Sequence, residues 1–246
     1  MGTKARYIGG VQSFYDDGTF ETVHKMSPVR YQDDFLGAGS LVIPAAGSGE
    51  SGADWVKKIV GAAPPAVAGV ANAIGGQISC ALTSASQKQD AGLYWGDQKG
   101  IDVTKGAVFE ARIRLSVLPS ATGVQAVAGL SSDWIDGPDN NTCYIQVQAN
   151  GSGLLSVRSY DGVTATAVSS GVTLTTADWA IVRIDCTDVT DVSVFINGDK
   201  VTTSSQINFA ATGTLAVLQP YLGLYKASGT GVGTMLIDFV KIWQNR

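Results

Sequence analysis

The chain has 246 residues, enough for one large β domain, and its 17 basic and 21 acidic residues give a formal net charge of −4. No basic stripe is present, which argues against partners such as nucleic acid or an anionic membrane. Charged residues make up only 15% of the chain, while Gly, Ser, Thr, Ala and Val are abundant, so the composition favours a β protein with a neutral, hydroxyl-rich surface.

The first 30 residues differ from the rest of the chain. They hold one hairpin signal, Asp17-Gly18, the only histidine, His24, and little apolar sequence of the kind that forms a core. We interpret residues 1–30 as an N-terminal arm, either a floppy tail or an ordered segment that pairs with a neighbouring subunit, and expect the main domain, 31–246, to begin near Tyr31. The segment has no apolar core of a signal peptide, and no run in the chain is long enough to span a bilayer. The aromatic residues of the arm expected to contact another subunit are Tyr7, Phe14, Tyr15 and Phe20.

The rest of the chain predicts strands joined by tight turns. "AVFEARIRLSV", residues 107–117, alternates apolar and polar positions, which is typical of a strand with one buried face. "WAIVRIDC", "DVSVFIN" and "TMLIDFVKIWQ" are further expected strands, and Asn150-Gly151, Asp161-Gly162 and Asn197-Gly198 are expected turns. Pro220 interrupts "TLAVLQPYLGLYKA", which predicts a sheet edge or a bulge there. No window has a convincing helical period.

The three cysteines, Cys80, Cys143 and Cys186, are far apart in sequence, and each lies in an apolar, strand-like run. We expect buried free thiols rather than a disulfide framework or a metal site, which fits synthesis in a reducing cytosol.

The ordered set of segments resembles a known fold. "YQDDFLG", "DWVKKIVG", "AVFEARIRL", "AVAGLSSDW", "YIQVQ", "LQPYLGLYKASG" and "MLIDFVKIWQNR" follow one another over residues 31–246. In this order they are similar to the concanavalin A-like lectin/glucanase jelly roll, in the version found in structural proteins of tailed-bacteriophage virions. The resemblance implies an all-β, two-sheet antiparallel sandwich with an extended N-terminal arm, and a role as a capsid decoration or stabilising protein.

Glu110 decides whether the sequence predicts a sugar-cleaving enzyme. Retaining glycosidases need two carboxyl groups about 5–5.5 Å apart. The only glutamates are Glu21, Glu50 and Glu110, and no two of them share an expected strand. Arg112 and Arg114 flank Glu110 on its expected face, which disfavours a proton donor. Glu110 is therefore expected to belong to a charge-balanced face or a subunit contact, and no catalytic residue is predicted.

The segment "DWIDGPDNNT" gathers oxygen-bearing side chains. Asp133, Asp136 and Asp139 are the candidate ligands for Ca²⁺, although a plain polar loop is the favoured interpretation and no cofactor is expected. His24 has no nearby nucleophile or acid, so a catalytic triad is unsupported. Exposed aromatic rings stack on sugars, and the candidate carbohydrate contacts are Trp134, Asn140, Trp95 and Tyr160.

The sequence thus predicts a non-enzymatic structural component of a tailed-phage virion, made in the bacterial host cytoplasm. Its expected partners are the major capsid protein or other virion proteins and further copies of itself, with a trimer as the assumed oligomer. A carbohydrate-binding module or adhesin that contacts host-surface glycans is the alternative. A glycoside hydrolase is a third, disfavoured interpretation.

Overall fold

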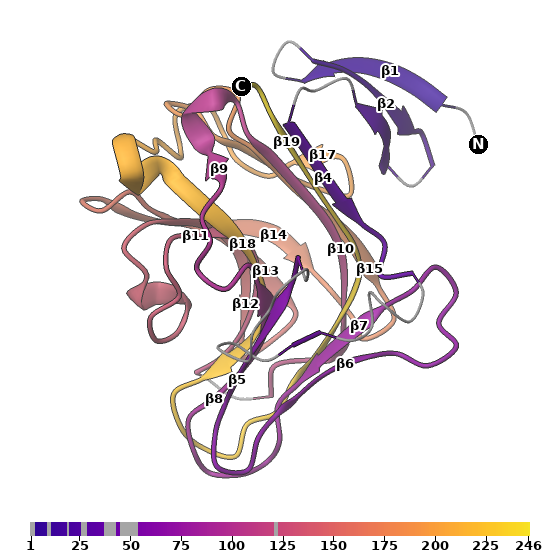
Figure 1. The fold of residues 1–246 in the computed structure, drawn as a ribbon, viewed down its shortest axis with the longest axis vertical. Coiled ribbons are helices and arrows are strands. Elements are labelled where there is room, and N and C mark those ends of the chain that lie inside the picture. The colour runs from indigo at the N-terminus through magenta and orange to yellow at the C-terminus, as the bar shows by residue number, and fades with distance from the viewer. Residues whose placement is uncertain are drawn as a thin grey trace.

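The computed structural model describes residues 3–8, 11–18, 20–25, 29–36, 43–44, 54–120 and 123–246. Within these ranges the chain is all β, and the only helical elements are three short 3-10 helices: η1 (Val103–Lys105), η2 (Pro138–Asn140) and η3 (Gly213–Ala216). Two large antiparallel sheets pack face to face, which confirms the predicted sandwich (Figure 1). Among the described residues, no helix is both long and apolar enough to cross a membrane.

Both sheets bend in the same direction, so one of them has a hollow outer face (Figure 1). We call this one the concave sheet. Its strand order is β14 (Ala165–Thr173), β13 (Leu154–Tyr160), β12 (Tyr144–Asn150), β11 (Val124–Ser131), β18 (Val217–Lys226), β8 (Gln89–Tyr94) and β5 (Val56–Val60), with β9 (Ile101–Asp102) paired to β18.

The second sheet, the convex sheet, contains the strand predicted at residues 107–117. Its order is β17 (Asp199–Lys200), β16 (Ser193–Ile196), β15 (Trp179–Asp185), β10 (Val108–Val117), β19 (Thr234–Gln244), β7 (Ile78–Ala81) and β6 (Ala66–Gly69), with β4 (Val29–Asp33) paired to β19.

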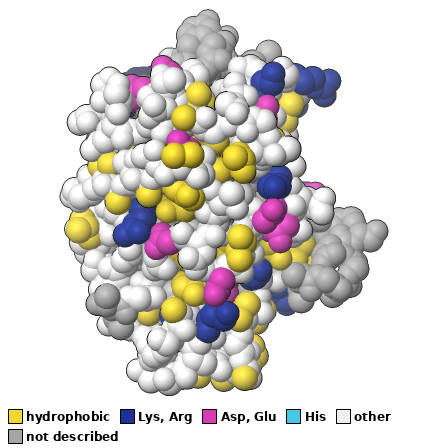
Figure 2. Space-filling model, turned by 90° about the vertical axis from the view of Figure 1, so that its left-hand side faces the viewer, with side chains coloured by type: hydrophobic (Ala, Val, Ile, Leu, Met, Phe, Trp, Pro, Cys, Tyr) yellow, Lys and Arg dark blue, Asp and Glu magenta, His cyan; other side chains and the backbone are white. Residues whose placement is uncertain are grey.

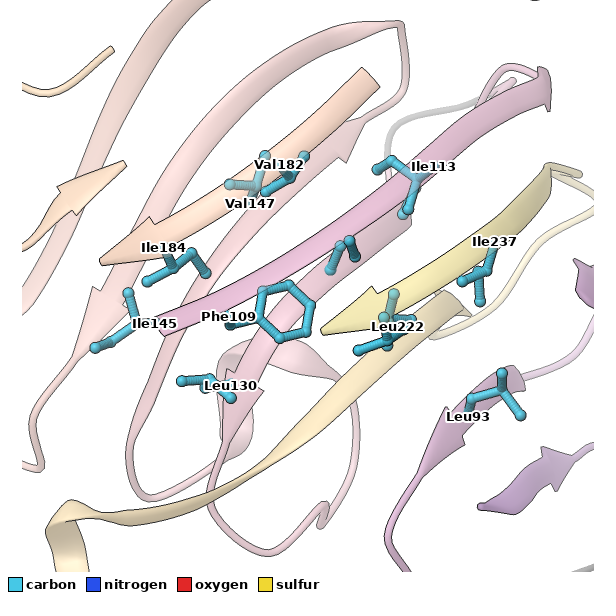
Figure 3. Packing of buried hydrophobic residues seen from close by; sticks show 14 of the residues in the cluster. Leu93, Phe109, Ile113, Leu130, Ile145, Val147, Val182, Ile184, Leu222 and Ile237 are labelled. Atoms are coloured by element: carbon cyan, nitrogen blue, oxygen red, sulfur yellow. The ribbon is translucent and has the colours of Figure 1, made fainter. Parts of the chain in front are cut away.

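The core lies between the two sheets and follows from the alternation of each strand. Phe109 of the convex sheet points toward Leu130 of the concave sheet, and Ile184 toward Ile145 (Figure 3). These side chains are fully buried, and each contributes about 1.5–3 kcal/mol to the stability of the fold. Burial of the inward residues therefore also determines which residues face outward, because neighbouring residues on a strand point to opposite faces of the sheet.

The three cysteines are free and buried, as predicted. Cys80 and Cys186 lie in the core between the sheets, and burial raises the pKa of both thiols. Neutral thiols in an apolar core act as small hydrophobic side chains.

The turn signals read from the sequence are confirmed. Asn197 and Gly198 both have positive φ, at 51° and 88°, in the turn between β16 and β17. Gly162 lies in the turn between β13 and β14, and Gly151 in the turn between β12 and β13. These short connections place β12, β13 and β14 side by side in one meander.

The prediction for Pro220 is wrong. Residues 217–226 form one continuous strand, β18, in the middle of the concave sheet. β8 pairs with β18 only from Tyr221 onward, and β9 pairs only with Val217 and Leu218. Pro220 falls in the gap between these two partners, so its missing N–H breaks no ladder hydrogen bond on that side.

Residues of the expected arm form a separate three-stranded sheet of β1 (Thr3–Ile8), β2 (Val11–Asp16) and β3 (Thr22–Lys25). This arm sheet lies beside the convex sheet near β19 and β4 (Figure 1). Lys241 of β19 donates a 2.5 Å hydrogen bond to Glu21, and Phe20 packs so close to Gly198 that a Cβ there would lie 2.5 Å from its ring.

The candidate subunit contacts of the arm lie in or beside this sheet. Phe14 and Tyr15 are half-buried, the Arg6 guanidinium lies 4.3 Å from the centre of the Tyr15 ring, and the side chain of Tyr7 lies outside the described residues. The pairing of Val29–Asp33 with β19 puts residues 29 and 30 in the sandwich. The division into an arm and a domain, and the contact of the arm with another subunit, stay predictions.

Candidate functional site

The outward positions of the concave sheet are polar and aromatic where the inward ones are aliphatic. On β12, Ile145 and Val147 point into the core, so Tyr144, Gln146 and Gln148 point outward. Figure 2 shows this face, on which acidic and basic side chains lie close to hydrophobic ones and form no single charged patch. Register pairs Gln146 with Arg158 of β13, which brings an amide and a guanidinium side by side.

One half of this face is covered by the loop between β11 and β12. Trp134 of that loop stacks on Tyr221 of β18, with ring centres 3.3 Å apart and planes 4° from parallel. The Tyr221 ring lies over Gly92, where a Cβ would come within 2.5 Å of its hydroxyl. Trp134 and Tyr221 are 2% and 0% exposed, so this covered half, over β11, β18 and β8, is closed to a ligand.

A buried carboxyl group holds the covered half together. Asp90 of β8 accepts hydrogen bonds from Trp134 Nε1 and from the Tyr221 hydroxyl, both 2.5 Å long. Burial raises the pKa of Asp90 to about 6, despite the two hydrogen bonds and Lys58, which all favour its charged form.

This raised pKa predicts how stability changes with pH. The folded protein holds the Asp90 proton up to about pH 6, whereas an unfolded aspartate loses it near pH 4. The folded state therefore binds more protons between these values, so the free energy of unfolding falls as pH rises through this window, by on the order of 3 kcal/mol from this group. Urea unfolding of wild type and Asp90→Asn across the window measures this; an identical pH dependence in the two proteins would refute it.

The other half of the face, over β12, β13 and β14, is open. It contains a cavity of about 220 Å³ whose lining combines hydroxyl, amide and guanidinium groups with apolar side chains. The lining residues are Asn150, Ser152, Leu154, Ser156, Arg158, Ala167, Val168 and Ser169. This open half is a shallow groove with hydrogen-bonding walls, of the kind that suits a hydroxyl-rich ligand.

Asp139 is the charged centre of the open half. Its carboxylate accepts hydrogen bonds from Gln125 Nε2 at 2.8 Å and Gln148 Nε2 at 3.2 Å, and pairs with Arg158 Nη1 at 3.4 Å. η2 presents Asp139 in its first turn, directly after Pro138. The short helix therefore sets a carboxylate over the strands that carry its partners.

Two polar atoms of the open half have no hydrogen-bond partner within the described part of the chain. They are Arg158 Nε and Gln148 Oε1, and both are buried. Unpaired buried polar atoms are rare in folded proteins because each costs about 1–3 kcal/mol. Their presence beside a cavity marks this part of the face as the candidate site.

Tyr144 is the third component of the open half. Burial, with the nearby Asp139 carboxylate, raises the pKa of the Tyr144 phenol, although Arg158 opposes the shift. The ring lies 6.1 Å from that of Tyr160, whose hydroxyl is already bonded to the Gly162 carbonyl at 3.0 Å. Tyr144 is therefore a neutral O–H donor beside a carboxylate and a guanidinium.

The loop with the candidate Ca²⁺ ligands, for which a plain polar loop was the favoured interpretation, pairs its three carboxylates with three different basic side chains. Asp133 pairs with Lys99 at 3.2 Å, Asp136 with Lys88 at 3.3 Å, and Asp139 with Arg158. Within the described ranges, no group of three or more His, Cys, Asp or Glu side chains could hold a metal ion. These residues act as partners of basic side chains rather than as a common ligand set.

The four candidate carbohydrate contacts occupy different places. Tyr160 lies in the open half, while Trp134 is buried against Tyr221 and offers no free ring face. Asn140 is exposed and donates to the Asp136 carbonyl, and Trp95 packs edge-on against Tyr31 with ring centres 5.2 Å apart, in a separate aromatic group. Whether any of them contacts a sugar stays a prediction.

Glu110 and His24 lie away from the open half. Glu110 is fully buried on the outer face of the convex sheet, where it is in register with Arg183 of β15 and Lys241 of β19. His24 belongs to the arm sheet, and Glu50 lies outside the described residues. The sequence did not indicate that Gln148, Arg158 and Asp139 meet at one site, although "YIQVQ" already places two glutamines on one face.

The fold has relatives among solved structures, although no family model and no curated protein matches the chain. The chain is similar to a putative β-glucanase from Mycobacterium abscessus, with a TM-score of 0.56, 18% identity, and coverage of 87% of this chain and 99% of that one. It is also similar to an endo-β-1,4-glucuronan lyase from Trichoderma reesei, with a TM-score of 0.54, 14% identity, and coverage of 76% and 90%. An alginate lyase of polysaccharide lyase family 7 matches with a TM-score of 0.51, 15% identity, and coverage of 73% and 83%. The chain thus has the jelly-roll fold of glucanases and polysaccharide lyases.

These matches correct the function predicted from the sequence. A non-enzymatic phage capsid protein was expected, but the solved structures that share the fold include glucanases and polysaccharide lyases. The expectation rested on the resemblance to virion structural proteins and on the lack of two glutamates on one expected strand. Glu110, on which that argument centred, lies on β10 in the convex sheet and so takes no part in the concave face.

Proposed function

We propose that this protein is a polysaccharide lyase that cleaves a polymer of uronic acids in the open half of the concave face. The observation that carries the proposal is Arg158 of β13, which lines the cavity and pairs with the Asp139 carboxylate, with the neutral Tyr144 phenol on the neighbouring strand β12. A guanidinium binds a carboxylate more specifically than any other side chain, so it suits a sugar that carries an acid group.

The three side chains match the three needs of β-elimination. Arg158 neutralises the sugar carboxylate and stabilises the negative charge that spreads onto it when the C5 proton leaves. The Asp139 carboxylate takes that proton, and the electron pair forms a C4–C5 double bond as the bond from C4 to the glycosidic oxygen breaks. Tyr144 gives its proton to the leaving oxygen, and afterwards Asp139 releases the C5 proton to water while water returns a proton to the Tyr144 phenolate.

Elimination fits the described residues better than hydrolysis does. Hydrolysis needs an acid and a second carboxylate on opposite sides of one bond. Among the described residues, Asp139 is the one carboxylate that contacts side chains of the open half, because Asp133 and Asp136 pair with Lys99 and Lys88 and Asp90 is covered by Trp134. A second carboxylate for hydrolysis is therefore missing from the described part of this half. The glucuronan and alginate lyases among the structural matches are enzymes of this kind built on the same fold. The β-glucanase among the matches makes hydrolysis the alternative reaction that an assay has to distinguish from elimination.

A substrate panel tests the proposed reaction class. We expect the protein to act on polymers of glucuronic, mannuronic or guluronic acid and to raise the ultraviolet absorbance that a new C4–C5 double bond produces. Neutral β-glucans should give no such signal. Release of reducing ends from neutral glucans without ultraviolet absorbance would replace the lyase by a hydrolase.

Removal of the Tyr144 hydroxyl should slow the reaction. We expect Tyr144→Phe to lower kcat by roughly 100-fold, with little change in KM, because the phenol acts only as the leaving oxygen departs. Tyr160→Phe is the matched control, since its hydroxyl is engaged by the Gly162 carbonyl and a much smaller effect is expected. Equal effects of the two substitutions would remove Tyr144 from its role as the acid.

A further inference from the structure

A second cavity lies between strands of the two large sheets, at the border of the core. We call it the side cavity; its volume is about 310 Å³, and it is lined by Tyr31, Asp54, Trp95 and Gln98. Tyr31 belongs to β4, which pairs with β19 of the convex sheet, whereas Asp54 and Trp95 lie at the ends of β5 and β8 in the concave sheet. β11 and β18 separate β8 from the strands of the open half, so the side cavity is distinct from the proposed lyase site.

Two aromatic rings form walls of the side cavity. Tyr31 and Trp95 are half-buried and pack against the core, with ring centres 5.2 Å apart and planes at 77° to each other. The buried ring of Trp55 packs edge-on against Tyr31, with ring centres 5.9 Å apart, and so helps to fix its position. A ligand in the cavity therefore meets aromatic surface in two nearly perpendicular planes. The faces of such rings carry partial negative charge and attract cations within about 6 Å.

Carboxyl groups add negative charge beside these rings. Asp54 is exposed and lines the cavity, while Asp33 accepts a 3.0 Å hydrogen bond from Trp55 Nε1. Burial raises the pKa of Asp33 against the effect of its hydrogen bonds, and the charges of Asp34 and Asp54 add to the rise. Burial also raises the pKa of the Tyr31 phenol, again with the charges of Asp33 and Asp54. Negative charge thus dominates the surroundings of the cavity, which favours a cation as its ligand.

We propose that the side cavity binds a small organic cation with a methylated ammonium group, such as choline. A metal ion does not suit the site, because the carboxylates of the described chain form no group that could hold one and the aromatic walls offer few oxygen ligands. A primary ammonium is strongly hydrated, whereas methyl groups pack on aromatic faces and spread the charge. The methyl groups of the ligand contact Tyr31 and Trp95, its charge lies near the Asp54 carboxylate, and Gln98 is available to hydrogen-bond its hydroxyl.

Calorimetric titration with choline and with its neutral analogue tests the need for charge. In the analogue, a tert-butyl carbon replaces the ammonium nitrogen and leaves the shape unchanged. We expect choline to bind and the analogue to bind at least about tenfold more weakly, because only the cation is attracted by the ring faces and the carboxylates. Equal binding of the two compounds, or no binding of choline, would overturn the proposal. Binding of cellobiose in place of choline would do the same, since it would make the cavity a sugar site.

Substitutions test whether choline binds at this cavity. Asp54→Asn removes one exposed charge and should weaken choline binding by about fivefold without loss of the fold. Asp199→Asn is the matched control, because it makes the same change on the exposed edge strand β17, which three strands separate from β19. Trp95→Ala should weaken binding by more than about tenfold, while Trp95→Phe keeps a ring and most of the affinity.

Thermal unfolding shows whether the two Trp95 variants are folded, and the comparison of Asp54→Asn with Asp199→Asn decides the matter if they are not. Equal choline affinities in these two aspartate variants would contradict the proposed site. The titrations use no uronic acid polymer, so their outcome is independent of the proposed lyase activity.

Discussion

Arg158→Ala is expected to reduce the rate of polyuronate cleavage by roughly 1,000-fold, the range found when a donor to developing negative charge is removed. Arg158 is the only described basic residue that lines the cavity of the open half, and its Nε has no partner there. Without it, the charge that develops on the sugar carboxylate would be stabilised only by neutral amides. Steady-state kinetics on a uronic acid polymer measures the loss, which should appear in kcat as well as in KM.

Arg158→Lys separates charge from geometry. Lysine keeps the positive charge but cannot offer the two parallel N–H groups of a guanidinium, so we expect only partial recovery of the rate. Thermal unfolding should be nearly unchanged in both variants, because the pairing of Arg158 with Asp139 is exposed and surface pairs contribute about 0–1 kcal/mol. Full activity in Arg158→Ala would place the reaction elsewhere on the protein.

Trp134→Ala is expected to lower the free energy of unfolding by about 4 kcal/mol, in the range for truncation of a buried tryptophan. The substitution removes the ring stacked on Tyr221 and leaves Asp90 with one hydrogen-bond donor fewer. Both losses occur in a closed part of the protein, where refilling by water is limited. Urea unfolding at neutral pH, with the slope of the transition compared with wild type, measures the effect.

Trp134→Phe divides the loss into its two causes. Phenylalanine retains an aromatic ring over Tyr221 but lacks the N–H that donates to Asp90. We therefore expect a smaller loss than in Trp134→Ala, with most of the difference due to stacking and buried area. A loss below about 1 kcal/mol in Trp134→Ala would show that the loop contributes little to the folded state.

The fold could be predicted largely from the sequence because its signals are local. Alternation identified β10 and β15, and Asn197-Gly198 identified a turn whose positive φ values few other pairs adopt. The prediction for Pro220 was wrong because a central strand accepts proline only where no neighbouring strand needs its N–H. Here that depends on where β8 ends and β9 begins, and no residue near Pro220 in the sequence indicates these two boundaries.

The candidate site could not be predicted in the same way because it is made by contacts between distant segments. Gln125, Asp139 and Arg158 come from three separate elements, and only the strand order of the concave sheet brings them together. Trp134 was a candidate for contact with a sugar because it adjoins a polar loop. Its burial depends on Gly92 and Tyr221, which are far away in sequence.

Cleavage in water enriched in heavy oxygen tests the central claim most directly. Elimination adds no water across the broken bond, so mass spectrometry should find unsaturated products that carry no heavy oxygen from the cleavage. Hydrolysis would instead give saturated products, each heavier by one water and labelled at the new reducing end. Unlabelled, unsaturated oligosaccharides from a uronic acid polymer are the result that we predict, and labelled, saturated ones would contradict it.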